Sequence, residues 1–148
     1  MSELAVSDGA VSGAVRFWLR AEGLAVLVLS IVLYGSFGAR WWLFLALFFA
    51  PDLSMLGYLI NTKVGAVCYN VVHSYFLPLA LATLAMVLGR SNALPYLFIW
   101  FAHIGFDRAL GFGLKYPTAF GRTHLGSARG LATRVGLMQS PPQSARYS

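Results

Sequence analysis

Four long apolar stretches dominate the chain and are separated by short loops. They cover residues 17–37, 41–60, 64–88 and 93–114. Each is close to the roughly 20 residues that an α-helix needs to cross about 30 Å of hydrocarbon. Because the loops hold only a few residues, neighbouring helices must run antiparallel. The pattern predicts an all-α fold, an integral membrane four-helix bundle.

Composition supports this class. Of the 148 residues, 58% are hydrophobic and 11% are charged, whereas a soluble domain has about 25% charged residues. The first 15 residues lack a basic segment, and no small-residue cleavage site follows the first apolar stretch, so we expect the first helix to be retained. Cys68 is the sole cysteine, which excludes an intramolecular disulfide, and we interpret it as a packing residue.

The chain divides into three predicted parts. Residues 1–15 are small and polar and are expected to be mobile, and residues 16–116 form the transmembrane domain. Residues 117–148 are basic, with a short interfacial helix predicted over 125–137 and a disordered tail. The sequence shows no internal repeat, which disfavours a transporter built from two inverted halves.

The net charge of +6 is distributed unevenly between the two sides of the predicted bundle. With four helices, both termini share one side with the loop at Lys63, whereas Arg40 and Arg90 lie on the other. The shared side holds Arg16, Arg20, Lys63, Lys115, Arg122, Arg129, Arg134 and Arg146. The positive-inside rule therefore predicts cytoplasmic termini. Anionic membrane lipids explain this charge better than nucleic acid does.

Polar residues interrupt the apolar stretches at one depth. Pro51 is expected to kink the second helix beside Asp52, because proline lacks a backbone donor and clashes one turn back. Counted from the side of the termini at about 1.5 Å per residue, the polar residues fall roughly 7 to 17 Å deep. They are Glu22, Asp52, Asn70, His73, His103 and Asp107. Helices entering from opposite sides need not agree in this way, so the sequence predicts one shared intramembrane site.

Four segments carry a resemblance to a known family. "PDLSMLGYLIN", "YNVVHSYFLPL", "AHIGFDRALGFGLKY" and "THLG", in this order and spacing, resemble domain of unknown function family 4260, a group of small bacterial integral membrane proteins. The resemblance covers roughly residues 16–126, and Phe112, just before GLKY, stands where a tyrosine is expected in a GYGLKY version of this block. It implies a four-helix protein of the bacterial inner membrane, and no activity, substrate or cofactor.

The polar residues favour a metal site. Asp52, His73, His103 and Asp107 offer two imidazoles and two carboxylates from three helices, enough for zinc, iron or manganese with an open position. His124 is a further candidate ligand. An acidified water could then attack an ester, phosphate or amide bond in a lipid-like substrate, which predicts a metal-dependent hydrolase.

Four other residues are candidates for catalysis. Glu22 could act as general base, and Tyr69 and Asn70 could orient a ligand or substrate. Arg108 has three interpretations: it snorkels to headgroups, pairs with a carboxylate such as Glu22 or Asp52, or contacts a substrate phosphate or carboxylate.

Alternatives remain open because the spacing is only moderately specific. The sequence has no HExxH motif, and Asn70 stands where di-iron bundles place a glutamate. The polar residues could instead form a metal-free functional site, or a structural network of paired charges. Ion or proton transport is a second function class. A third is an accessory subunit of a membrane complex or a homo-oligomer, docked through the small-residue row Gly105, Ala109 and Gly113.

Overall fold

The computed structural model describes residues 13–115, 122–123 and 125–127. In this part of the chain, five α-helices and two 3-10 helices precede a two-residue antiparallel β ladder. The elements are α1 (Gly13–Ser36), α2 (Trp41–Phe48), η1 (Ala50–Leu59), α3 (Thr62–Val72), α4 (Phe76–Val87), η2 (Ser91–Ala93), α5 (Leu94–Leu110), β1 (Arg122–Thr123) and β2 (Gly126–Ser127).

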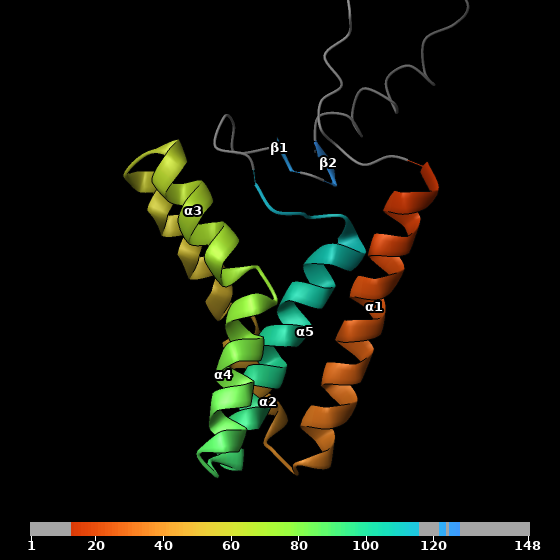
Figure 1. The fold of residues 1–148 in the computed structure, drawn as a ribbon, viewed down its shortest axis with the longest axis vertical. Coiled ribbons are helices and arrows are strands. Elements are labelled where there is room, and N and C mark those ends of the chain that lie inside the picture. Colours follow the sequence, from red (N-terminus) through yellow and green to blue (C-terminus); the bar gives the residue numbers. More distant parts are fainter. Residues whose placement is uncertain (1–12, 116–121, 124, 128–148) are drawn as a thin grey trace, which may run out of the picture.

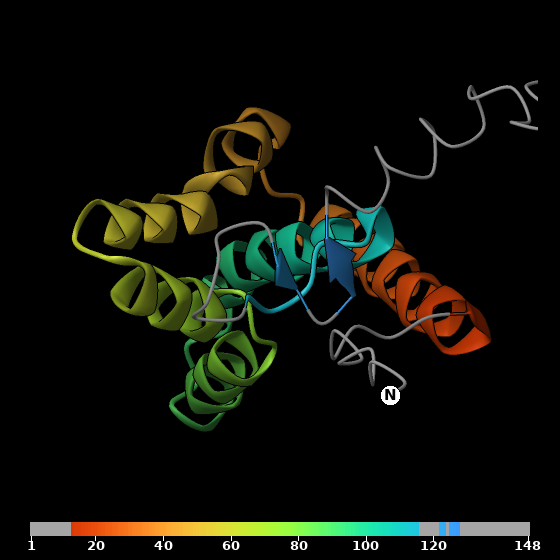
Figure 2. The ribbon, with the colours of Figure 1, turned by 90° about the horizontal axis from the view of Figure 1, so that it is seen from above.

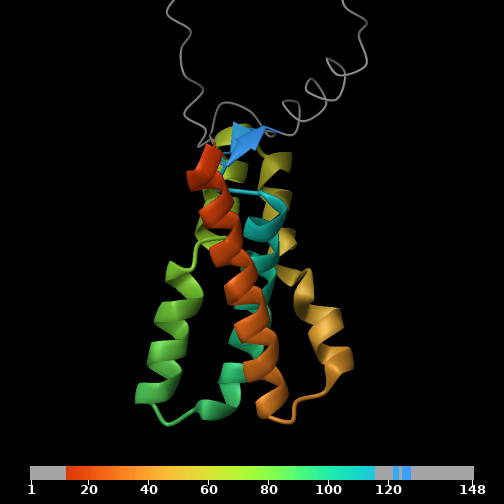
Figure 3. The ribbon, with the colours of Figure 1, turned by 90° about the vertical axis from the view of Figure 1, so that its right-hand side faces the viewer.

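The helices form four antiparallel arms. The chain runs down α1, returns through α2 and η1, descends again through α3 and α4, and rises through α5 (Figure 1). The start of α1 and the β ladder therefore lie at the same end of the molecule (Figure 3). Seen from that end, α5 lies between α1 and the pair formed by η1 and α3 (Figure 2). The most extensive packing joins α1 to α5 and α3 to η1.

The second predicted helix changes type at the expected place. The α-helix ends at Phe48, and a 3-10 helix begins at Ala50. Pro51 stands in its first turn, and the Asp52 amide donates to the Phe49 carbonyl over 3.1 Å, three residues back. The break that Pro51 predicts is confirmed. Beyond it, however, the chain forms a ten-residue 3-10 helix, which is long for this helix type and typical of a functional or strained segment.

The third predicted helix is also broken, and the expectation of one continuous helix over residues 64–88 is wrong. The α3 helix ends at Val72, α4 begins at Phe76, and the two are bent by 41°. We attribute the break to Pro78, because a proline has no N–H for the carbonyl of Ser74 and its ring clashes with a carbonyl one turn earlier in a continuous helix. Five α-helices therefore replace the predicted four, and His73 caps the end of α3.

Two helical segments, Gly13–Ser36 and Trp41–Leu59, are long and apolar enough to cross a membrane, and α3 with α4 makes a third if the bent pair is one span. The α5 helix has 17 residues and stops before the predicted 114, because Gly111 adopts a left-handed φ of 95°, a conformation that ends helices. Large apolar side chains are exposed along α1, α2, η1 and α4.

Helices α1 and α5 approach each other at two glycines. A Cβ on Gly105 would lie 2.7 Å from both the Gly23 carbonyl oxygen and the Leu27 nitrogen. Close backbone packing of this kind is typical of helix pairs in membranes. Gly105, which we expected on a docking face for a partner protein, is therefore covered by α1 of the same chain.

Several expectations concern the ends of the chain. Residues 1–12, 116–121, 124 and 128–148 lie outside the described part, and with them most of the predicted mobile N-terminus, His124 and the tail. Residues 126–127 belong to β2, so the interfacial helix expected from residue 125 does not begin there.

Candidate metal centre

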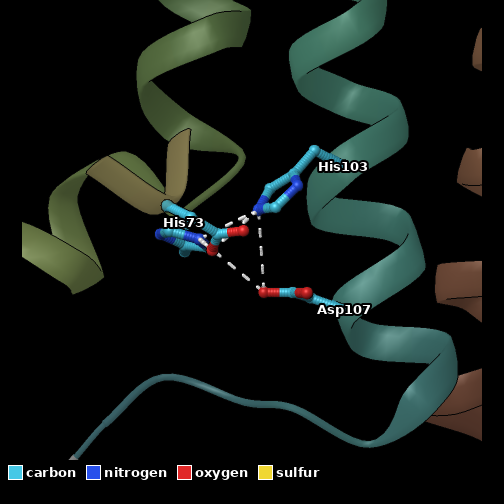
Figure 4. Close-up of side chains that lie close together, drawn as sticks. His73, His103 and Asp107 are labelled. Atoms are coloured by element: carbon cyan, nitrogen blue, oxygen red, sulfur yellow. Dashed lines mark hydrogen bonds and ion pairs between the residues drawn. The ribbon is translucent and has the colours of Figure 1, made fainter. Parts of the chain in front are cut away.

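Four ionisable side chains from three elements meet at one point. Asp52 comes from η1, His73 from the end of α3, and His103 and Asp107 from α5. Each offers one donor atom, and the four atoms lie within 4.8 Å of one another. His103 and Asp107 point from neighbouring turns of α5 toward His73 (Figure 4). We call these four residues the Asp/His cluster.

The donor spacing suits a single ion. The two histidine Nε2 atoms are 3.1 Å apart. Oδ1 of Asp52 lies 3.4 and 3.5 Å from them, and Oδ2 of Asp107 lies 3.7 and 3.9 Å from them. Four ligands at 2.0–2.2 Å from a tetrahedral ion are about 3.3–3.6 Å apart. These five distances, 3.1 to 3.9 Å, lie within a few tenths of an ångström of that spacing.

Tyr69 holds two members of the cluster. The Nδ1 atom of His73 lies 3.1 Å from the Tyr69 carbonyl. A carbonyl only accepts, so this nitrogen carries the proton and Nε2 keeps its lone pair for a metal. The Tyr69 hydroxyl donates to Oδ2 of Asp107 over 3.0 Å, and its ring stacks on His73 at 3.8 Å. Tyr69 therefore contacts ligands from both α3 and α5.

The break after α3 leaves carbonyls that α5 satisfies. Trp100 donates its Nε1 proton to the Val72 carbonyl over 2.8 Å, and Arg108 donates to the His73 carbonyl over 2.9 Å. The second Arg108 donor reaches the Phe112 carbonyl over 2.9 Å. Side chains of α5 thus fix the backbone that carries His73.

Asn70 joins α3 to the segment after α5. Its side-chain amide donates to the Lys115 carbonyl over 2.9 Å, and its oxygen accepts from the Lys115 amide over 2.7 Å. The Lys115 ammonium lies 4.3 Å from the centre of the Tyr69 ring. Partial burial lowers the pKa of Lys115, whereas Asp107 and Asp52 raise it. From the sequence, Lys115 was counted only among the basic residues at the membrane surface, and its place in the GLKY block was the signal that could have marked it as part of the site.

A pocket of about 300 Å³ opens beside the cluster. Its lining residues are Phe49, Asp52, Met55, Tyr69, His103, Phe106, Asp107, Leu110, Phe112 and Lys115. The side chain of Asp52 is 34% exposed and that of Asp107 13%, whereas both histidines are buried. A ligand in the pocket would therefore reach the cluster from its carboxylate side.

The comparison with protein families agrees with the resemblance seen in the sequence. A family model described as "Domain of unknown function (DUF4260)" matches residues 16–128. The chain belongs to this family. No curated protein and no solved structure matches it. The family description names no activity, so the function of this DUF4260 protein must be argued from its site.

The other predicted site residues fall in different places. In the DUF4260 chain, Tyr69 contacts the Asp/His cluster directly, and Asn70 and Arg108 hold backbone around it. Glu22 is exposed on α1 and contributes no atom to the cluster. Within the described residues no ion pair joins Arg108 to Glu22 or Asp52, and the pairing proposed for it is replaced by two carbonyl contacts.

The donor set fits a divalent cation. Two carboxylates and two neutral imidazoles balance the charge of such an ion, and this mixture of N and O ligands suits zinc, iron and manganese. The second histidine has no such partner to orient its ring. Its Nδ1 atom, that of His103, is buried and has no hydrogen-bond partner within the described residues. The Asp/His cluster could hold a metal, with His73 the better oriented of its two histidines.

Proposed function

We propose that this chain is a metal-dependent hydrolase of the bacterial inner membrane that acts on a lipid-like substrate. The observation that carries the proposal is the spacing of the four donor atoms, which lie within 4.8 Å of one another at the edge of a pocket. In the proposed topology four spans cross the bilayer, the broken α3–α4 pair is one of them, and both termini are cytoplasmic.

The arrangement of the helices supports this topology. The α1 helix has 24 residues and is about 36 Å long at 1.5 Å per residue. The 17 residues of α5 are at the lower limit of roughly 17 for a span, and this helix is the most enclosed of the arms. Its buried residues include both His103 and Ile99. A shorter central helix is tolerated where protein rather than lipid surrounds it.

The cluster could support hydrolysis if the ion takes a fifth ligand, a water, on the side of the pocket. A divalent ion there would act as a Lewis acid and lower the pKa of a bound water. Asp52, the most exposed of the four residues, is placed to accept the proton of that water. Such a water could add to an acyl or phosphoryl centre as the bond to the leaving group breaks, and Asp52 would return the proton to the leaving oxygen or nitrogen.

Placement of the polar residues favours catalysis over transport. The Asp/His cluster and its pocket lie toward the end of the molecule that holds the start of α1. Further along α5, toward its N-terminus, the buried cluster is apolar and aromatic and comprises Tyr34, Phe44, Ile99 and Ala102. A conduction path through one chain requires polar groups at that end as well.

Metal content is the first test. The full chain is purified in a neutral detergent without chelators, and bound metals are measured together with the His103→Ala and Asp52→Asn variants. We expect close to one divalent ion per chain in the parent protein and a large loss in both variants. Glu22→Gln is the matched control, because Glu22 is an exposed acidic residue outside the cluster, and it should keep the metal.

Activity is the second test. The metal-loaded parent is assayed with chromogenic acyl esters and phosphodiesters of medium chain length, before and after chelation and after the metal is restored. Hydrolysis that disappears on chelation and returns with the metal supports the proposal. A parent protein that retains no metal, or a loaded protein that cleaves none of these bonds, would overturn it.

A further inference from the structure

The lining of the pocket beside the Asp/His cluster includes a lysine, Lys115, that has no role in the metal chemistry proposed above. Within the described residues, the charged groups in its lining are Asp52, Asp107 and Lys115. A divalent ion would neutralise the two carboxylates, and Lys115 would be the third charged residue among the described residues of the lining. Metal loading therefore changes the charge of this pocket from negative to positive, and a positive pocket with apolar walls favours an anionic ligand.

Lys115 is held close to the cluster by its backbone and by its side chain. The two hydrogen bonds to Asn70 fix its main chain against α3. Its ammonium lies 4.3 Å from the centre of the Tyr69 ring and 5.2 Å from that of Tyr58. The Tyr69 hydroxyl in turn donates to Asp107. One side chain, that of Tyr69, therefore lies in contact with both the ammonium and a candidate metal ligand.

The other walls of the pocket are apolar and continue to the surface. Phe49, Leu110 and Phe112 line it, and each is at least half exposed. Met55 and Phe106 complete the wall and are partly buried. In the proposed topology, exposed apolar side chains of this kind would face acyl chains, and an alkyl group could then reach the pocket from the lipid. A ligand that matches both parts is an anionic amphiphile.

We propose that Lys115 selects substrates that carry a phosphate or carboxylate group beside the bond to be cleaved, with an alkyl chain against Phe49, Leu110 and Phe112. This inference rests on the metal-dependent function proposed above and specifies its substrate class. Lys115 contacts the anionic group and determines specificity, and the Asp/His cluster performs the chemistry. Binding of the anion requires the metal, because without it the two carboxylates repel the ligand.

Binding of simple probes tests the inference. Zinc-loaded full chain in neutral maltoside detergent is titrated by calorimetry with dodecyl phosphate, inorganic phosphate, dodecanol and dodecyltrimethylammonium. Dodecyl phosphate should bind at least about tenfold more tightly than the neutral or cationic amphiphile, as expected for one charge-assisted contact. It should also bind more tightly than inorganic phosphate, because the latter has no alkyl chain to bury.

Variants separate the role of Lys115 from a general effect of basic charge. Lys115→Met should lose about tenfold in affinity for dodecyl phosphate while keeping its metal, and Lys115→Arg should recover most of the loss. Lys63→Met is the matched control, because Lys63 is an exposed lysine at the start of α3, and it should bind the probe like the parent. Metal removed by chelation should weaken binding in the parent protein as well.

The results distinguish the two proposals. A parent without metal overturns the proposed function, and the metal analysis shows this directly. A loaded parent that binds dodecyl phosphate no better than dodecanol, or equally well with Met at position 115, overturns the inference and leaves the hydrolase proposal standing. Inorganic phosphate binding as tightly as dodecyl phosphate would overturn the amphiphilic substrate class and indicate a free phosphate compound instead.

Discussion

The hydroxyl of Tyr69 lies 3.0 Å from Oδ2 of Asp107, the same oxygen that lies 3.7 Å from Nε2 of His73. One side chain thus orients a carboxylate of α5, and the carbonyl of the same residue orients an imidazole of α3. Partners of this kind fix the ring orientation and basicity of metal ligands. Tyr69 contributes no metal-binding atom, but it orients two of the four residues that could bind the metal.

Replacement of Tyr69 by Phe should weaken metal binding without removing the site. The variant loses the hydrogen bond to Asp107 and keeps the aromatic ring that stacks on His73. Loss of a supporting partner typically costs about 10- to 100-fold in metal affinity. Competition with a chromogenic chelator measures the change. Tyr96→Phe is the control, because Tyr96 is about half exposed and lies in the first turn of α5, and an equal loss in both variants would contradict the prediction.

The break between α3 and α4 should depend on Pro78. Alanine at this position restores an N–H for the Ser74 carbonyl and removes the clash of the ring, so the two helices can become continuous. His73 would then rotate with the helix, and metal affinity should fall. Hydrogen exchange at residues 73–78 should slow at the same time, because new helical hydrogen bonds protect these amides.

The control for this variant is Pro95→Ala. Pro95 stands in the first turn of α5, where a missing N–H costs little, and metal affinity should stay unchanged. If Pro78→Ala binds metal like the parent and exchange is not slowed, then the bend comes from the contacts of α5 and not from the proline.

The sequence predicted that the four donor residues lie together, and it predicted less of the backbone that carries them. His103 and Asp107 are one helical turn apart, so their shared face follows from periodicity alone. Counting residues along antiparallel helices places Asp52 and His73 at the same level in the bundle as this pair. Pro51 likewise indicated the break before Asp52, because a proline lacks a backbone donor and clashes with the carbonyl one turn earlier.

Other features of the structure depend on tertiary contacts, which the periodicity of the sequence does not reveal. Pro78 carried the same signal as Pro51, yet the apolar run around it favoured one continuous helix. Lys115 lies after the end of α5, and only the fold brings it to Asn70. For Arg108 the sequence left snorkelling, a carboxylate partner and a substrate contact open, and in the structure it donates to the His73 carbonyl at the break after α3. Competition between such partners is decided by geometry and not by residue type.

Loss of the Arg108 contacts should destabilise the protein more than loss of an exposed arginine. In Arg108→Met the His73 carbonyl loses its charged donor, and leaving such a group unsatisfied costs about 1–3 kcal/mol. Thermal unfolding in detergent should show a lower Tm and some loss of metal. Arg90→Met, at an exposed position between α4 and η2, should change the Tm little. Equal effects would mean that the carbonyl contacts contribute no stability.

The packing of α1 on α5 gives the last prediction. A methyl group at Gly105 would lie 2.7 Å from two backbone atoms of α1, those of Gly23 and Leu27, and backbone cannot yield as a flexible side chain does. Gly105→Ala should therefore separate the two helices at a cost of about 1–3 kcal/mol, typical of overpacking. The free energy of unfolding in a denaturing detergent measures this cost.

Gly35→Ala is the matched control for Gly105→Ala. A Cβ there would lie 3.5 Å from the Trp41 ring, an ordinary contact, and alanine favours a helix over glycine by about 1 kcal/mol. This variant should be as stable as the parent or slightly more stable. A Gly105→Ala protein of unchanged stability would show that α1 and α5 can shift apart freely, in which case the position of His103 does not depend on α1.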